Sequence, residues 1–187
     1  PDLIIDSDHM MAISPDEGGT SRAVYLANVL GLDMGMFYKR RDYTQIVDGR
    51  NPIVAHEFLG SSVEGKDVII IDDMISSGDS IIDVATELKR RKAKRIFAAA
   101  TFGLFTNGLD KFDKAYEEGI IHGILTTNLI YQTPELLSRP YYINCDLSKY
   151  IALLIDTLNH DGSISSILSP NERIQHVVQK YKNGEPI

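Results

Sequence analysis

The stretch of sequence that decides the fold is VIIIDDMISSGDSI, residues 68–81. An apolar run ends in two adjacent carboxylates, Asp72 and Asp73, and a hydroxyl-rich turn with one glycine follows. The next segment, IIDVATELKRRK (81–92), has the spacing of an amphipathic helix. A strand, a tight turn and a helix N-terminus in this order are typical of an anion site, because free backbone N–H groups and the helix dipole point at the turn.

Apolar runs alternate with helical patterns along the rest of the chain, which indicates βα units and a parallel sheet. Strands are expected at 10–14, 34–38, 67–72, 95–101, 123–128 and 141–145, and helices at 19–31, 79–92, 108–119, 147–159 and 170–181. The segment from about 42 to 63 lacks periodicity, and a long segment of this kind in a compact domain is often functional. The sequence therefore predicts one α/β domain over residues 1–187, with a twisted, mostly parallel sheet flanked by helices.

Composition narrows the class of protein. The 187 residues are 43% hydrophobic and 24% charged, which is enough for one α/β domain with a substantial core. The net charge of −7 argues against nucleic acid as a partner, and the apolar runs are shorter than the roughly 18–20 residues of a membrane helix. One cysteine, Cys145, excludes an internal disulfide and fits a reducing compartment, so we expect a cytoplasmic protein. The chain begins at Pro1 without an initiator Met, and we expect it to be a piece of a longer protein.

The residue types in the opening stretch point to a sugar phosphate. The turn carries three hydroxyls and a glycine that permits close approach of a ligand: Ser76, Ser77, Gly78 and Ser80. These groups suit a phosphate, whereas Asp72 and Asp73 can accept hydrogen bonds from vicinal hydroxyls or bind Mg²⁺. An alternative stays open on the pattern alone, since two aspartates after an apolar strand can also form a helix cap in a solvated loop.

Three motifs carry a family resemblance. The stretch VIIIDDMISSGDS resembles the loop of type I phosphoribosyltransferases that binds phosphoribosyl pyrophosphate (PRPP), and its Asp-Asp-Met-Ile opening is most similar to the ribose-phosphate pyrophosphokinases, or PRPP synthetases. AISPDEGG (12–19) resembles their Ser-Pro-Asp-x-Gly segment, and FYKRRD (37–42) resembles the Lys-Arg-Arg that opens their flexible catalytic loop. The resemblance extends through KAKRIFAAATFGLF and NHDGSISSIL, so nearly the whole chain is similar to the C-terminal half of such an enzyme.

The resemblance implies a phosphoribosyltransferase-type fold and the transfer of diphosphate from ATP to ribose 5-phosphate, with Mg²⁺ as cofactor. It assigns the ribose hydroxyls to Asp72 and Asp73, and the divalent cation to Asp16. It assigns the 5-phosphate to the loop made of Ser76, Ser77, Gly78, Asp79 and Ser80. Lys39 and Arg41 would act on the transferring diphosphoryl group from a mobile catalytic loop at about 39–63. The family also implies a homo-oligomer, with dimers that build a hexamer in the full-length protein.

Other interpretations of these residues remain. Without the resemblance, Lys39 and Arg41 are typical of a solvated loop, and Asp16 is typical of a helix cap. Asp79 stands where the family has glycine and puts a negative charge beside the expected phosphate. That charge favours a non-catalytic, synthetase-like regulatory subunit, whereas the retained Lys39, Arg41, Asp72 and Asp73 argue against one. A PRPP-consuming phosphoribosyltransferase would share the Asp-Asp loop, but it needs a base-recognising hood segment for which the sequence offers no candidate.

Overall fold

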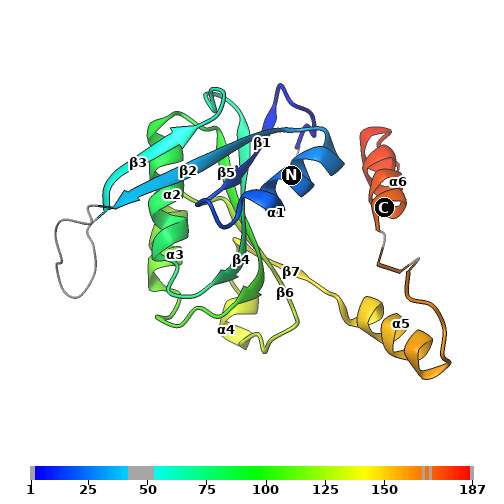
Figure 1. The fold of residues 1–187 in the computed structure, drawn as a ribbon. Helices are drawn as coiled ribbons and strands as arrows, with labels where there is room; N and C mark the ends of the chain where they lie inside the picture. Colours follow the sequence, from blue (N-terminus) through cyan, green and yellow to red (C-terminus); the bar gives the residue numbers. More distant parts are fainter. Residues whose placement is uncertain (1–2, 42–52, 166, 169, 186–187) are drawn as a thin grey trace.

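A seven-stranded sheet organises the computed structural model, which describes residues 3–41, 53–165, 167–168 and 170–185 (Figure 1). The strands are β1 (Met10–Ser14), β2 (Asp33–Arg41), β3 (Ile53–Leu59), β4 (Asp67–Ile75), β5 (Arg95–Gly103), β6 (Gly123–Thr127) and β7 (Tyr142–Cys145). Their order across the sheet is β3-β2-β1-β4-β5-β6-β7, and every neighbouring pair is parallel except β2 with β3. The prediction of a mostly parallel α/β fold is therefore confirmed.

Helices lie on both faces of the sheet. They are α1 (Thr20–Leu30), α2 (Asp79–Arg90), α3 (Asp110–Glu117), α4 (Pro134–Leu137), α5 (Ser148–Asn159) and α6 (Asn171–Lys182). The chain steps from β1 to β2 through α1 and, in the opposite direction along the sheet, from β4 to β5 through α2. Because such crossovers are right-handed, α1 covers one face, and α2 and α3 cover the other (Figure 1).

The core explains why the central strands are apolar in their middle on both faces. All five residues of β1 are buried, and Val68 and Ile70 of β4 are fully buried between the helices. From α2, one face packs into this core with four buried side chains, Ile81, Val84, Ala85 and Leu88. Its acidic first residue and basic last turn match the helix dipole.

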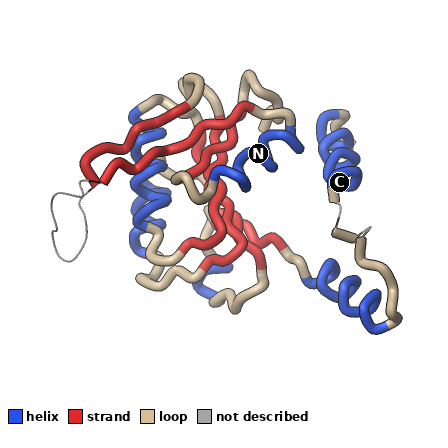
Figure 2. The backbone as a smooth tube through the Cα atoms, in the orientation of Figure 1, coloured by secondary structure: helices blue, strands red, loops and turns tan. Residues whose placement is uncertain are grey.

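The expected elements are confirmed, but the structure differs from the prediction in two places. The segment from about 42 to 63 was expected to lack regular structure, and this was wrong for residues 53–59, which form β3. Strand β2 continues through Arg41, and β3 pairs with it in the antiparallel direction, from the Met36–Leu59 pair to the Arg41–Ile53 pair. The two strands form a ribbon that projects from the body of the domain (Figure 2). The short helix α4, capped by the Thr133 side chain on the Leu136 N–H at 3.1 Å, was also not predicted.

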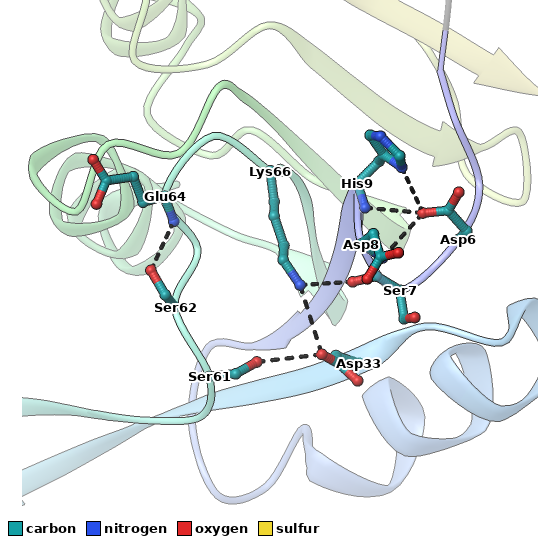
Figure 3. A network of polar contacts seen from close by, with 9 residues as sticks. All are labelled: Asp6, Ser7, Asp8, His9, Asp33, Ser61, Ser62, Glu64 and Lys66. Carbon is teal, nitrogen blue, oxygen red and sulfur yellow. Dashed lines mark hydrogen bonds and ion pairs between the residues drawn. The ribbon is translucent and has the colours of Figure 1, made fainter.

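Polar contacts tie three segments together at the amino ends of the central strands (Figure 3). Lys66, in the turn before β4, donates to the Ser7 carbonyl at 2.6 Å and pairs with Asp33 of β2 at 3.6 Å. Asp6 accepts from the His9 backbone N–H at 2.9 Å and contacts the His9 ring at 2.7 Å. These contacts lie at the edge of the sheet opposite the one that carries the turns after β1 and β4.

The C-terminal helices contribute little to the core. No residue of α5 is buried, and α6 returns to α1, where Tyr25 donates to Asn171 at 2.8 Å. Farther along α6, the Tyr181 hydroxyl donates to the Leu3 carbonyl at 2.8 Å. None of the helices in the described ranges has both the length and the apolar character that a membrane-crossing segment requires.

We expect the ion pair between Asp67 and Arg95 to stabilise the start of the β4–β5 pairing. Asp67 is buried, and its two carboxylate oxygens accept from Arg95 Nε at 2.8 Å and from Nη2 at 2.6 Å. Asp67→Ala removes the carboxylate that neutralises the largely buried guanidinium of Arg95. Urea denaturation should therefore show that the free energy of unfolding falls by about 3 kcal/mol. Glu64→Ala is the matched control, because its pair with Lys92 is exposed and should contribute less than about 1 kcal/mol. Equal losses in the two variants would contradict this assignment.

Candidate functional site

The expected site residues gather at the carboxyl ends of β1 and β4, which are parallel neighbours in the middle of the sheet. From this point the chain leaves β1 toward β2 on one side and leaves β4 toward β5 on the other. Such a topological switch point opens a crevice at the carboxyl ends of the strands, and ligands of open α/β sheets bind there. The turns after β1 and β4 both border this crevice.

The turn after β1 orients Asp16. Ser14 is fully buried, and its hydroxyl donates to the Asp16 carbonyl at 2.6 Å. The Gly19 N–H, just before α1, donates to Asp16 Oδ1 at 3.0 Å. A Cβ on Gly19 would lie 2.7 Å from Ser14 Oγ, so the tight turn requires glycine there. Asp16 thus closes the turn that leads into α1, but it does not cap the helix itself, whose N-cap Gly19 has no side-chain cap hydrogen bond. Its charge also acts on Asp72 across the crevice.

Asp72 and Asp73 form an acidic pair at the end of β4. Asp72 Oδ1 accepts from the Asp73 N–H at 2.8 Å, and Asp73 Oδ1 accepts from the Met74 N–H at 2.9 Å. The Asp72 side chain is only 17% exposed, and this burial, together with the Asp73 and Asp16 carboxyls, raises the pKa of Asp72. A hydrogen bond with the Asp72 carboxyl lowers the pKa of Asp73.

Arg22 of α1 supplies a cation to this pair. Its Nη2 lies 3.2 Å from Asp72 Oδ1 and 3.6 Å from Asp73 Oδ1. Sequence reasoning missed this residue, because nothing in its local spacing indicates a partner fifty residues away. The signal lies in the topology, since α1 begins at the same edge of the sheet at which β4 ends.

The turn from Ser76 to Gly78 is held from behind by α3. Gly78 has φ +83°, and a Cβ there would lie 2.1 Å from Phe112 Cζ, so only glycine fits. The loop after β5 braces the same turn, because the Thr106 N–H donates to the Ser76 carbonyl at 3.0 Å. Ser76 and Ser80 are exposed and Ser77 is partly so, which leaves this end of α2 open to a ligand.

The charge of Asp79 is balanced. Its carboxylate forms an ion pair with Lys111 of α3, and it accepts from the Ser77 hydroxyl at 2.8 Å. The contact with Lys111, and to a smaller extent the contact with Ser77, lowers the pKa of Asp79. The sequence shows the negative charge of Asp79 but not its partner, because Lys111 lies more than thirty positions away in the chain.

Lys39 and Arg41 lie within β2 rather than at the start of an irregular loop. In the backbone register, Lys39 pairs with His56 and Arg41 with Ile53. Since Met36 pairs with Ser14, the last residue of β1, β2 continues past the carboxyl end of β1 toward the crevice side. Part of the expected catalytic loop, residues 42–52, and the side chains of Lys39 and Arg41 lie outside what the structure describes.

An open cavity of about 510 Å³ adjoins the acidic pair on the α1 face of the sheet. Arg22 and Asp72 line its polar end, whereas Leu26, Leu125 and Cys145 belong to its apolar wall. Burial raises the pKa of the Cys145 thiol, which disfavours the reactive thiolate form.

The carboxylates of the crevice suit a divalent cation that keeps most of its hydration shell. In the part of the chain that the structure describes, no three His, Cys, Asp or Glu side chains are arranged as a ready-made metal cage. Mg²⁺ does not need one, because it commonly binds through one or two carboxylates together with water and substrate phosphates. Asp16 and Asp72, which interact electrostatically, are the residues that could provide them.

Residues 6–122, more than half of the chain, match the phosphoribosyl transferase domain. The matched segment includes Asp16, the acidic pair and the turn at 76–80. The phosphoribosyltransferase-type fold that the motifs indicated is also found in a solved relative. The crystal structure of phosphoribosylpyrophosphate synthetase from Mycobacterium smegmatis superimposes with a TM-score of 0.67 at 25% identity, over 82% of this chain and 46% of that one.

Curated relatives of this chain are named ribose-phosphate pyrophosphokinase. The chain is 31% identical to the ribose-phosphate pyrophosphokinase of Vibrio parahaemolyticus over 164 residues, which are 87% of this chain and 49% of that protein. It is 29% identical to the ribose-phosphate pyrophosphokinase of Mycoplasma pneumoniae over 165 residues, 88% of this chain and 48% of the relative. The chain therefore spans about half the length of the curated relatives it matches.

We expect Gly78→Ala to distort the turn before α2. The new Cβ would combine the strain of a left-handed backbone with overlap against the Phe112 ring, so the free energy of unfolding should fall by about 3 kcal/mol. Gly65→Ala is the matched control, since Gly65 has φ +75° but no atom within 4 Å of the added Cβ. It should lose only about 1 kcal/mol. Urea denaturation would contradict the packing explanation if both variants lost the same amount.

We expect Lys111→Met to raise the pKa of Asp79 toward its ordinary value of 3.8. A lowered pKa means that Asp79 stabilises the folded state above pH 3.8, and that this contribution disappears as the pH falls through the folded-state pKa. As the pH is lowered, the free energy of unfolding should therefore fall less in the variant than in the unaltered chain. Carboxyl NMR titration measures the pKa directly. Lys114→Met removes the same charge from α3 without touching Asp79, and an equal pKa rise in that control would overturn the assignment.

Proposed function

Because the chain belongs to the phosphoribosyltransferase domain family, we propose that it binds ribose 5-phosphate as the sugar-phosphate half of a ribose-phosphate diphosphokinase. The observation that carries this proposal is the position of two complementary groups at one crevice. An acidic pair ends β4, and a turn rich in hydroxyls opens α2 four residues later. The first suits a diol and the second suits a phosphate.

The two ends of the sugar phosphate use different parts of this strand–turn–helix unit. Asp72 and Asp73 accept hydrogen bonds from the ribose hydroxyls. The 5-phosphate lies in the loop of Ser76, Ser77, Gly78, Asp79 and Ser80, where serine hydroxyls and the N-terminus of α2 favour an anion. Asp79 does not oppose the phosphate at full strength, since Lys111 neutralises it.

The whole protein would transfer diphosphate from ATP to ribose 5-phosphate and release AMP. Charge develops on the phosphate oxygens in such a reaction, and fixed cations stabilise it. We assign this role to Lys39 and Arg41, because β2 carries both of them past the carboxyl end of β1. Asp16 would hold Mg²⁺, which supplies further positive charge to the phosphates. Closure of the 39–63 segment over the site would exclude water as a competing acceptor.

The remaining parts of the reaction lie beyond this chain. Since the chain spans about half the length of its relatives, we expect ATP to be bound largely by the other half. A dimer-based homo-oligomer, a hexamer in the full-length protein, and a cytoplasmic location also belong to the proposal and rest on the family resemblance. The neutralised charge of Asp79 weakens the reason for reading the chain as a non-catalytic subunit.

Calorimetric titration of ribose 5-phosphate into the chain, with and without Mg²⁺, tests the proposal. We expect Asp73→Asn to weaken binding about tenfold or more, because it removes a charged hydrogen-bond acceptor. Ser80→Ala should weaken binding several-fold, since a neutral hydroxyl donor contributes about 1 kcal/mol.

Asp83→Asn is the control, because this exposed residue lies on α2 outside the loop at 76–80, and its substitution changes the net charge equally. Its affinity should equal that of the original chain. The proposal fails if the folded chain does not bind ribose 5-phosphate, or if Asp83→Asn weakens binding as much as Asp73→Asn.

A further inference from the structure

We propose that Arg22 is a positioning residue for sugar binding, which holds the Asp72 and Asp73 carboxylates side by side as acceptors for the ribose hydroxyls. This inference rests on the proposed function and assigns a role within the same site. Arg22 lies on α1, whereas the motif that it serves lies on β4 and the turn after it.

The geometry supports a bridging role. A single guanidinium nitrogen, Arg22 Nη2, lies 3.2 Å from Asp72 Oδ1 and 3.6 Å from Asp73 Oδ1. The same two oxygens accept the backbone N–H groups of Asp73 and Met74. Arg22 and the backbone therefore bind one oxygen of each carboxylate, which fixes the rotation of both side chains.

The pair needs a cation because its members repel each other. Asp72 and Asp73 are adjacent in sequence, and Asp16 adds a third carboxylate whose charge reaches Asp72. Two neighbouring carboxylates that lack a cation either move apart or retain a proton. A protonated or rotated carboxyl is a poorer acceptor for a hydroxyl. Among the ion pairs of the described residues, those of Asp72 and Asp73 are made with Arg22.

The Arg22 side chain lies partly buried beside the acidic pair. Its Nε is buried and has no hydrogen-bond partner among the described residues. Arg22 also lines the cavity beside the acidic pair, together with Leu26 and Ile71. A donor buried without a partner is unfavourable, and the ion pairs at the other end of the guanidinium offset it. The charge contacts to the acidic pair therefore hold the guanidinium in place.

The test compares two ligands that differ in one hydroxyl. Ribose 5-phosphate and 2-deoxyribose 5-phosphate share the phosphate, but the second lacks the diol that the acidic pair would bind. The chain should bind ribose 5-phosphate about tenfold or more tightly. In Arg22→Met this preference should nearly disappear, through a weaker affinity for ribose 5-phosphate and a nearly unchanged affinity for the deoxy sugar. Arg22→Lys retains the charge on a shorter side chain and should restore part of the preference.

Arg90→Met is the matched control. Arg90 is 77% exposed on α2 and pairs with Glu87, so its loss changes the net charge equally but should leave both affinities unchanged. Equal weakening of both ligands in a folded Arg22→Met chain would show a merely structural role and overturn the inference, as would an Arg22→Lys chain no better than Arg22→Met. If the unaltered chain binds neither ligand, the proposed function itself fails, and that result is distinct from the other two.

Discussion

The parallel pairing of β1 with β4 is the contact on which the rest of the site depends. These strands are separated by more than fifty residues in the chain, yet Met10 through Ile13 pair with Asp67 through Ile70. The pairing brings the turn that contains Asp16 beside the acidic pair. It also places the start of α1 next to the end of β4, so that Arg22 reaches Asp72. A loop of this length is entropically expensive to close, and the buried apolar residues of both strands offset that cost.

The proposed binding of a phosphate by an acidic chain requires that the carboxylates at the crevice be compensated by cations. The chain carries a net charge of −7, and three carboxylates border the crevice. The acidic pair and Asp79 are each matched by a cation from a different helix, Arg22 from α1 for the acidic pair and Lys111 from α3 for Asp79. The proposed sugar end and the proposed phosphate end are thus compensated separately.

Much of the fold could be predicted from the sequence, because the βα alternation is strong and the central strands are apolar on both faces. Asp72, Asp73 and the serine turn could be found because they are contiguous in the chain. Arg22, Lys111 and Phe112 could not, since each acts on a residue that only tertiary contacts bring near. Strand β3 could not be predicted from the sequence. It is an edge strand that pairs with β2, and its sequence, IVAHEFL, has no regular alternation of apolar and polar residues.

The contact between Phe112 and Gly78 has a consequence for binding thermodynamics. Phe112 is fully buried and meets the Phe105 ring edge-on at 5.1 Å, while the preceding residue, Lys111, pairs with Asp79. Two successive residues of α3 therefore fix both the backbone and the charge of the turn. The turn loses its conformational freedom when the protein folds rather than when the ligand arrives. The proposed binding of a small anion would then cost little ordering entropy, and the affinity of this turn would depend chiefly on direct contacts.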